Sequence, residues 1–103
     1  MKRGEVRWYK FKPPDKKRPV LILTRTSVID YLGEVTIAPI TSTIRDIPSE
    51  VPLSNVDGMP QECAVNLDLI QTVSKGKIGG LITELPLEKL SYVRQALSFA
   101  LDL

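Results

Sequence analysis

Two segments of the chain carry side chains suited to holding a phosphate group. Residues 16–18 (Lys-Lys-Arg) form a cationic cluster just before the apolar run Val20–Leu23. A second apolar run ends at Ile40 and is followed by three hydroxyl side chains at 41–43 (Thr-Ser-Thr). If these runs form neighbouring strands, a guanidinium and a hydroxyl meet at one end of a sheet. Both groups can donate hydrogen bonds to a phosphate.

Arg18 is the candidate for the charged contact. Its guanidinium stays protonated at every relevant pH and its planar fork fits a phosphate bidentately, while Pro19 restrains its backbone. The alternative is a surface arginine at the end of a strand. The hydroxyls of Thr41, Ser42 and Thr43 could donate to phosphate oxygens, and their alternative role is to form a turn.

Three polar residues interrupt the apolar stretch between Val65 and Val73. The carboxylate of Asp68 could accept a proton or orient Arg18, although a turn or bulge residue is an equal alternative. Asn66 lies two residues earlier, and Gln71 shares the polar side of this strand, where it could contact a base or the backbone of a nucleic acid.

Aromatic and cationic residues alternate near the N-terminus, where Trp8 and Tyr9 lie between Arg7 and Lys10. Such interleaving could stack the bases of a single strand. Core packing is the favoured role for Trp8, which leaves Tyr9 as the stacking candidate. The candidate RNA-binding residues are therefore Lys16, Lys17, Ser42, Asn66, Gln71 and Tyr9.

The charge of the chain is unevenly distributed. The formal net charge is +2, but residues 1–25 hold nine basic and two acidic side chains, and the remaining 78 hold five basic and ten acidic ones. This asymmetry favours a polyanionic partner for the N-terminal part, because phosphate contacts release counterions. The alternative is a solvated basic hairpin without a partner.

The composition limits the chemistry further. The chain has 103 residues, 43% hydrophobic and 25% charged, which is typical of one globular domain spanning 1–103. It has no histidine, and its single cysteine, Cys63, lies in an apolar stretch where burial is expected. We therefore expect no metal and no cofactor. No apolar run approaches the ~20 residues that cross a bilayer, so we expect a cytoplasmic protein without a membrane partner.

The hydrophobic pattern predicts a mainly β chain that ends in a helix. The expected strands are 4–11, 18–25, 34–40, 50–53, and 63–67 with 69–73, the last two being one strand if Asp68 is only an irregularity. We expect Pro39 at a bulge or strand end, and Pro52 on an edge strand. Segments 26–33 and 75–80 are interpreted as a weakly structured connection and as a turn with a bulge. Pro86 suits the first position of the helix. Together these elements predict an antiparallel β-barrel of about six or seven short strands.

These polar groups suit the cleavage of RNA by internal transesterification. The 2′-hydroxyl of the substrate is the nucleophile, so the protein must supply a proton acceptor, a donor to the leaving oxygen and stabilisation of the phosphorane charge. DNA lacks that hydroxyl and would not react.

In order and spacing, these segments resemble the MazF/PemK family of toxin endoribonucleases. The resemblance covers nearly the whole chain and rests on five segments: 2–6 (KRGEV), 18–23 (RPVLIL), 39–42 (PITS), the 68–73 strand and the C-terminal helix. By position, Arg18 matches the catalytic arginine of the family and Thr41 its catalytic threonine. Asp68 matches an acidic position that some members use.

The resemblance implies a small SH3-like β-barrel of the MazF/PemK/CcdB type, a homodimer, and sequence-selective cleavage of single-stranded RNA without a metal. The products would be a 2′,3′-cyclic phosphate and a 5′-hydroxyl, and the substrate mRNA, with tRNA or rRNA as alternatives. It also implies growth inhibition and a neutralising MazE-like antitoxin, through which alone DNA would be contacted.

The chain departs from the pattern of the family at three places. Its first loop, 12–17, has no glutamate, Asn66 replaces a second catalytic arginine of some relatives, and Gln71 replaces a frequent basic residue. The general base and acid are therefore not assigned. The alternative function is that of a non-enzymatic toxin like the gyrase poison CcdB, which shares this fold. An inactive, antitoxin-like or RNA-binding relative is a third reading.

Overall fold

The computed structural model describes residues 1–13 and 16–103. Pro14 and Asp15 of the expected loop at 12–17 lie outside this description. The strands along the described residues are β1 (Glu5–Lys10), β2 (Lys17–Ile22), β3 (Glu34–Thr41), β4 (Glu50–Leu53), β5 (Cys63–Asn66), β6 (Gln71–Ser74) and β7 (Ile78–Glu84). The helices are α1 (Thr26–Ile29) and α2 (Leu87–Leu101), with 3₁₀ turns η1 (Asn55–Asp57), η2 (Leu67–Leu69) and η3 (Lys75–Lys77).

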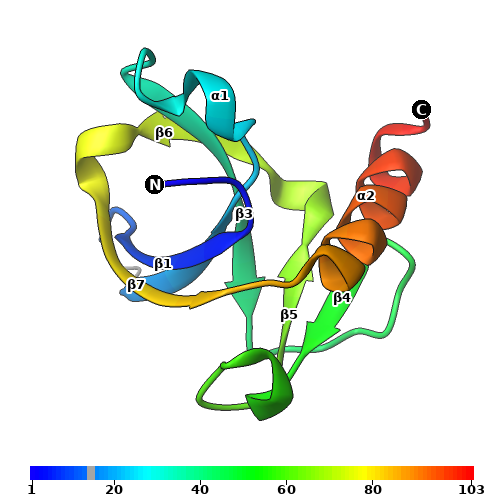
Figure 1. Cartoon of the computed structure of the whole chain (residues 1–103). Helices are drawn as coiled ribbons and strands as arrows, with labels where there is room; N and C mark the ends of the chain where they lie inside the picture. Colours follow the sequence, from blue (N-terminus) through cyan, green and yellow to red (C-terminus); the bar gives the residue numbers. More distant parts are fainter. Residues whose placement is uncertain (14–15) are drawn as a thin grey trace.

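The strands form one curled antiparallel sheet in the order β4-β5-β3-β2-β1-β7, and β6 also pairs with β3. Figure 1 shows β1 and β7 on one side of the molecule and β4, β5 and α2 on the other. No pairing among the described residues joins β4 to β7, so the expected barrel is not closed by hydrogen bonds. The mainly antiparallel β fold with a C-terminal helix is confirmed.

The central strand β2 buries both of its faces, as its continuous apolar run predicts. Leu21 belongs to a first core with Val65 of β5 and Val93 and Ala96 of α2. Val20 and its neighbour Ile22 belong to a second core on the opposite face, with α1 and the N-terminal part of β3. Because β2 is fixed from two sides, the residues at its beginning have a rigid support.

The expectation for Pro39 was wrong, since it lies inside β3 opposite Val20. The reason is a change of neighbour along the other edge of β3. Pairing with β6 ends at Ile37, and pairing with β5 begins only at Ile40. The missing N–H of the proline therefore falls in a gap between two ladders, where it removes no bond to either strand. Pro52, by contrast, lies on edge strand β4 as predicted.

Strands β5 and β6 are one extended segment with an insertion. Ile37 pairs with Gln71 and Ile40 pairs with Val65, so two residues of β3 lie between these pairs and five residues of the partner segment do, a difference of three. The extra residues match the three-residue turn η2, which contains Asp68. The predicted irregularity at Asp68 is confirmed, and it moves this side chain out of the regular ladder.

Two elements were missed in the sequence. The short helix α1 occupies part of the connection 26–33, and β7 begins inside the segment 75–80, which the sequence analysis interprets as a turn with a bulge. Gly79 belongs to β7 because the strand passes close to β1: a Cβ at this position would lie 3.1 Å from the carbonyl oxygen of Trp8. A side chain at Gly79 would thus be tight against β1, whereas a Cβ at Gly80 would have no atom within 4 Å.

Helix α2 covers the first core through Val93 and Ala96, at the side of the molecule where β4 lies (Figure 1). Pro86 takes the N-cap position and not the first helical position that the sequence predicted. The helix therefore begins one residue later than expected. Among the described residues, no helix has both the length and the apolar character needed to span a membrane.

Candidate nucleic-acid site

Arg18 and Thr41 lie on adjacent antiparallel strands and line the same surface hollow. Val20 pairs with Pro39 and Leu21 with Ala38, and extending this register by two residues puts Arg18 level with Thr41. Both residues line two adjoining hollows, of about 320 and 210 Å³, which we call the first and the second hollow. The two groups that the sequence analysis singled out are therefore brought together at one end of the sheet.

The hydroxyl of Thr41 is held by its own loop. The amide of Thr43 donates to Thr41 Oγ1 at 3.0 Å. The hydroxyl oxygen is thus used as an acceptor, and the hydroxyl hydrogen remains available to donate to an oxygen in either hollow. Arg18 is exposed, and its guanidinium is within 4.0 Å of no carboxylate oxygen of the described residues.

The first hollow joins an aromatic face to basic side chains. Its lining consists of Trp8, Lys16, Lys17, Arg18, Pro19, Ile40, Thr41, Ser42, Met59, Pro60, Gln61 and Cys63. The Lys17 ammonium lies 5.4 Å from the centre of the Trp8 ring. Core packing of Trp8 was therefore the wrong expectation: this half-buried ring forms part of the wall. An aromatic face between cations can stack a base whose phosphate the cations hold.

Tyr9, the predicted stacking residue, has a different environment. It is the cross-strand partner of Arg18, but it lines neither hollow of the described residues. Its ring packs edge-on against Phe11, with the centroids 4.7 Å apart, and both rings pack against the second core. Of these two neighbouring rings, Trp8 is the one that lines a hollow.

The second hollow adds a loop that the sequence analysis left out of the site. Its lining consists of Arg18, Pro39, Ile40, Thr41, Thr43, Arg45, Glu50, Asn66 and Leu69. Arg45 is exposed and Glu50 is only 7% exposed. The only signal in the sequence was that Arg45 follows the hydroxyl run within four residues; the burial of Glu50 at an edge strand gives no such signal.

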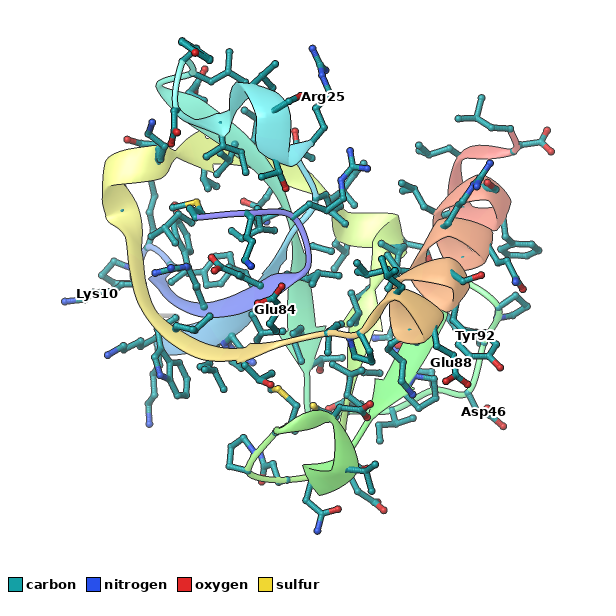
Figure 2. The ribbon with its side chains drawn as sticks, in the orientation of Figure 1. Lys10, Arg25, Asp46, Glu84, Glu88 and Tyr92 are labelled. Atoms are coloured by element: carbon teal, nitrogen blue, oxygen red, sulfur yellow. The ribbon has the colours of Figure 1, made fainter. Side chains whose placement is uncertain are left out.

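Glu50 supports the backbone of this loop. Its Oε1 accepts a hydrogen bond from the Arg45 amide at 2.9 Å, and its Oε2 is buried without a partner among the described residues. The backbone between them turns through Asp46, whose φ of 54° is in the left-handed region. Figure 2 shows Asp46 at the outer surface, on the side of α2. The loop is therefore held in one conformation beside Arg18 and Thr41.

Asn66, Asp68 and Gln71 are separated by the η2 insertion. Asn66 is buried, lines the second hollow, and accepts the Asp68 amide through Oδ1 at 2.9 Å. Asp68 lines neither hollow; its Oδ2 accepts a hydrogen bond from Ser49 Oγ at 2.5 Å. Gln71 is exposed on β6 and is also outside both hollows. The structure thus brings only Asn66 of this group to the site.

Cys63 lines the first hollow as a buried thiol. Burial raises its pKa, and the nearby charge of Asp57 raises it further. The thiol therefore stays protonated and is a poor nucleophile. The prediction of a buried side chain at this position is confirmed.

The sequence matches a family model over residues 2–101, described as PemK-like, MazF-like toxin of type II toxin-antitoxin system. "Endoribonuclease MazF3" of Mycobacterium tuberculosis is 42% identical over 89 residues, which are 86% of this chain and 86% of that protein. "Probable endoribonuclease MazF2" of the same organism is 38% identical over 94% of each.

Solved structures share the fold. The "Mycobacterium tuberculosis toxin MazF-mt6" superposes with a TM-score of 0.89 at 37% identity, covering 96% of this chain and 97% of that one. An "Endoribonuclease in complex with its cognate antitoxin from Mycobacterial species" superposes with a TM-score of 0.88 at 26% identity, covering 100% and 96%.

Proposed function

Because this chain belongs to the family of PemK-like, MazF-like toxins of type II toxin-antitoxin systems, we propose that it is an endoribonuclease that cleaves single-stranded RNA at its first and second hollows. The observation that carries the proposal is the convergence of Arg18 and Thr41 on both hollows. A gyrase poison would not need this pair, and no curated relative reported above has that function.

The reaction is an internal transesterification. The 2′-oxygen of one ribose loses its proton and forms a bond to the adjacent phosphorus, and the bond from phosphorus to the 5′-oxygen of the next nucleotide breaks. That oxygen takes up a proton, so the products are a 2′,3′-cyclic phosphate and a 5′-hydroxyl. The guanidinium of Arg18 neutralises the charge of the phosphorane, and Thr41 donates to one of its oxygens.

No step of this reaction needs a metal, because the nucleophile is already part of the substrate and the charge is met by a guanidinium. Lys16, Lys17 and Trp8 line the hollow that the flanking nucleotides would occupy. A base stacked on the Trp8 ring would also be positioned for selective contacts, which is how we account for cleavage at specific sequences.

A MazE-like antitoxin is the expected regulator, since a related endoribonuclease is known in complex with its cognate antitoxin. An acidic antitoxin segment could occupy the same basic hollow and exclude RNA. We further propose that the toxin is a homodimer that acts in the cytoplasm, where messenger RNA is available, and thereby stops growth.

The test is to incubate the purified protein with a long single-stranded RNA in excess chelator. We expect discrete fragments ending in a cyclic phosphate and no cleavage of DNA of the same sequence. Arg18→Ala should lose at least about 2 kcal/mol of transition-state stabilisation. Arg94→Ala is the matched control, because this exposed arginine of α2 lines neither hollow.

Two results would count against the proposal. Loss of cleavage in chelator would contradict metal-independent chemistry. Intact RNA together with inhibition of gyrase would replace the endoribonuclease by a CcdB-like toxin.

A further inference from the structure

We infer that Arg45 is a second phosphate-binding cation of this site, donating with Arg18 to the non-bridging oxygens of the phosphorane. The inference rests on the proposed endoribonuclease function and adds a catalytic residue to it.

Arg45 and Arg18 reach one small space from different elements. Arg18 comes from the beginning of β2, Arg45 from the loop after β3, and Thr41 from the end of β3. All three line the second hollow, whose volume is about 210 Å³. A phosphate bound in this space would lie next to all three residues.

The backbone of Arg45 is fixed although its side chain is exposed. Its amide donates to Glu50 Oε1 at 2.9 Å, and the Glu50 amide in turn donates to the Ile47 carbonyl at 3.0 Å. Glu50 is buried at the beginning of β4 and Asp46 supplies a left-handed turn. A cation on such a fixed loop is preorganised for charge stabilisation, because little reorganisation is needed when the charge develops.

The net positive charge of the second hollow favours an increase in negative charge at phosphorus. The phosphodiester carries one negative charge and the phosphorane carries two after the 2′-proton is lost. The guanidiniums of Arg18 and Arg45 and the carboxylate of Glu50 together give the second hollow a net charge of +1. That carboxylate also offsets the repulsion between Arg18 and Arg45 when no RNA is bound. Gain in negative charge at phosphorus is therefore favoured at this position.

The first measurement compares Arg45→Ala, Arg45→Lys and the control Arg94→Ala on an oligonucleotide that spans one mapped cleavage site. We expect roughly a 10²-fold lower kcat for Arg45→Ala, the scale of one lost transition-state donor. Arg45→Lys should regain part of it, because an ammonium keeps the charge but not the planar fork. The control should match the parent. If Arg45→Ala also matches the parent, the inference is wrong.

The second measurement keeps the inference separate from the proposed function. Binding of a 2′-O-methyl version of the oligonucleotide, which cannot be cleaved, is measured at several salt concentrations. Loss of one phosphate contact should lower the slope of log K against log salt by about 0.7 for Arg45→Ala. If the parent cuts no RNA, the proposed function fails, and this slope still decides whether Arg45 binds phosphate: an unchanged slope overturns the inference.

Discussion

At the scale of single residues, the hydroxyl of Thr41 combines two hydrogen-bonding roles. It accepts from the Thr43 amide, and Thr41 lines both hollows, where the hydroxyl can also donate. We expect Thr41→Val, which keeps the shape and removes the hydroxyl, to lower kcat by roughly 10²-fold. Thr41→Ser should retain most of the activity. If Thr41→Val stays active and Thr41→Ser loses activity, the methyl group and not the hydroxyl matters at this position.

Glu5 provides a residue-scale prediction about stability. It is 6% exposed and accepts a hydrogen bond from Arg7 Nε at 2.8 Å and one from the Lys2 amide at 3.1 Å. Burial alone would raise the pKa of Glu5, but these hydrogen bonds and the charge of Arg7 lower it overall.

A carboxyl whose pKa is lowered by folding stabilises the protein above the pKa of the unfolded chain, about 4.3, and this stability is lost as the pH falls through the folded value. We expect the free energy of unfolding to decrease between about pH 4.5 and pH 3, and Glu5→Gln to show a smaller decrease over this range. Urea titrations of both proteins at several pH values measure this. The exposed Glu88→Gln is the control and should follow the parent.

At the scale of elements, the turn between β4 and β5 is held against β7. The Thr83 hydroxyl donates to the Asp57 carbonyl at 3.0 Å, and Gly58 next to it has a φ of 91°. A Cβ at Gly58 would meet the Thr83 hydroxyl oxygen at 2.3 Å. We expect Gly58→Ala to lower the free energy of unfolding by at least about 2 kcal/mol, from the left-handed strain and the lost packing.

Gly33→Ala is the matched control for this change, because a Cβ there has no atom within 4 Å and the φ of Gly33 is not left-handed. It should be neutral or slightly stabilising, since alanine restricts the unfolded chain. Thermal unfolding followed by circular dichroism compares the two. A Gly58→Ala protein as stable as the Gly33→Ala protein would mean that the turn can move away from β7.

Local sequence patterns predicted the helices and strands that have the same surroundings along their whole length. The apolar run of β2 and the helical spacing of α2 each reflect one continuous environment, and both were found. Strand β7 was missed because its glycines weaken the strand pattern, and the close approach of Gly79 to β1 is a contact that no local pattern contains. The position of Pro39 inside β3 was not predictable for the same reason. It depends on the point at which β3 changes its neighbouring strand from β6 to β5.

At the scale of the whole molecule, part of the excess positive charge of the N-terminal residues lies at the first hollow. The basic N-terminal part supplies Lys16 and Lys17 to the first hollow, whereas Lys10 at the end of β1 points away from the body of the protein (Figure 2). We expect Lys16→Ala to lower the salt slope of RNA binding by about 0.7, as one lost contact to a single strand would. The control Lys77→Ala removes an equal charge from a residue that lines no described hollow, and should leave the slope unchanged. Fluorescence anisotropy with labelled RNA gives both slopes.

The site residues divide in the same way into those that a local sequence pattern indicates and those that depend on contacts with distant elements. Arg18 and Thr41 were predicted because both stand at the ends of apolar strands, where sequence position indicates spatial position. The places of Trp8 and Tyr9 were not predicted, because alternation alone does not say which side of β1 lines a hollow and which side packs against a core. Arg45 was missed because its place depends on a hydrogen bond to a buried carboxylate of another element.

Strand β3 belongs to both cores, with Ile37 in one and Ile40 in the other, and it ends at Thr41. We therefore expect that the unfolding of either core would disturb β3 and move the Thr41 hydroxyl out of register with Arg18. Heat should therefore switch the toxin off in a single step, with no temperature at which a partly melted form still degrades transcripts. Cells that make a destabilised variant would contain less folded toxin, and not a toxin with altered activity.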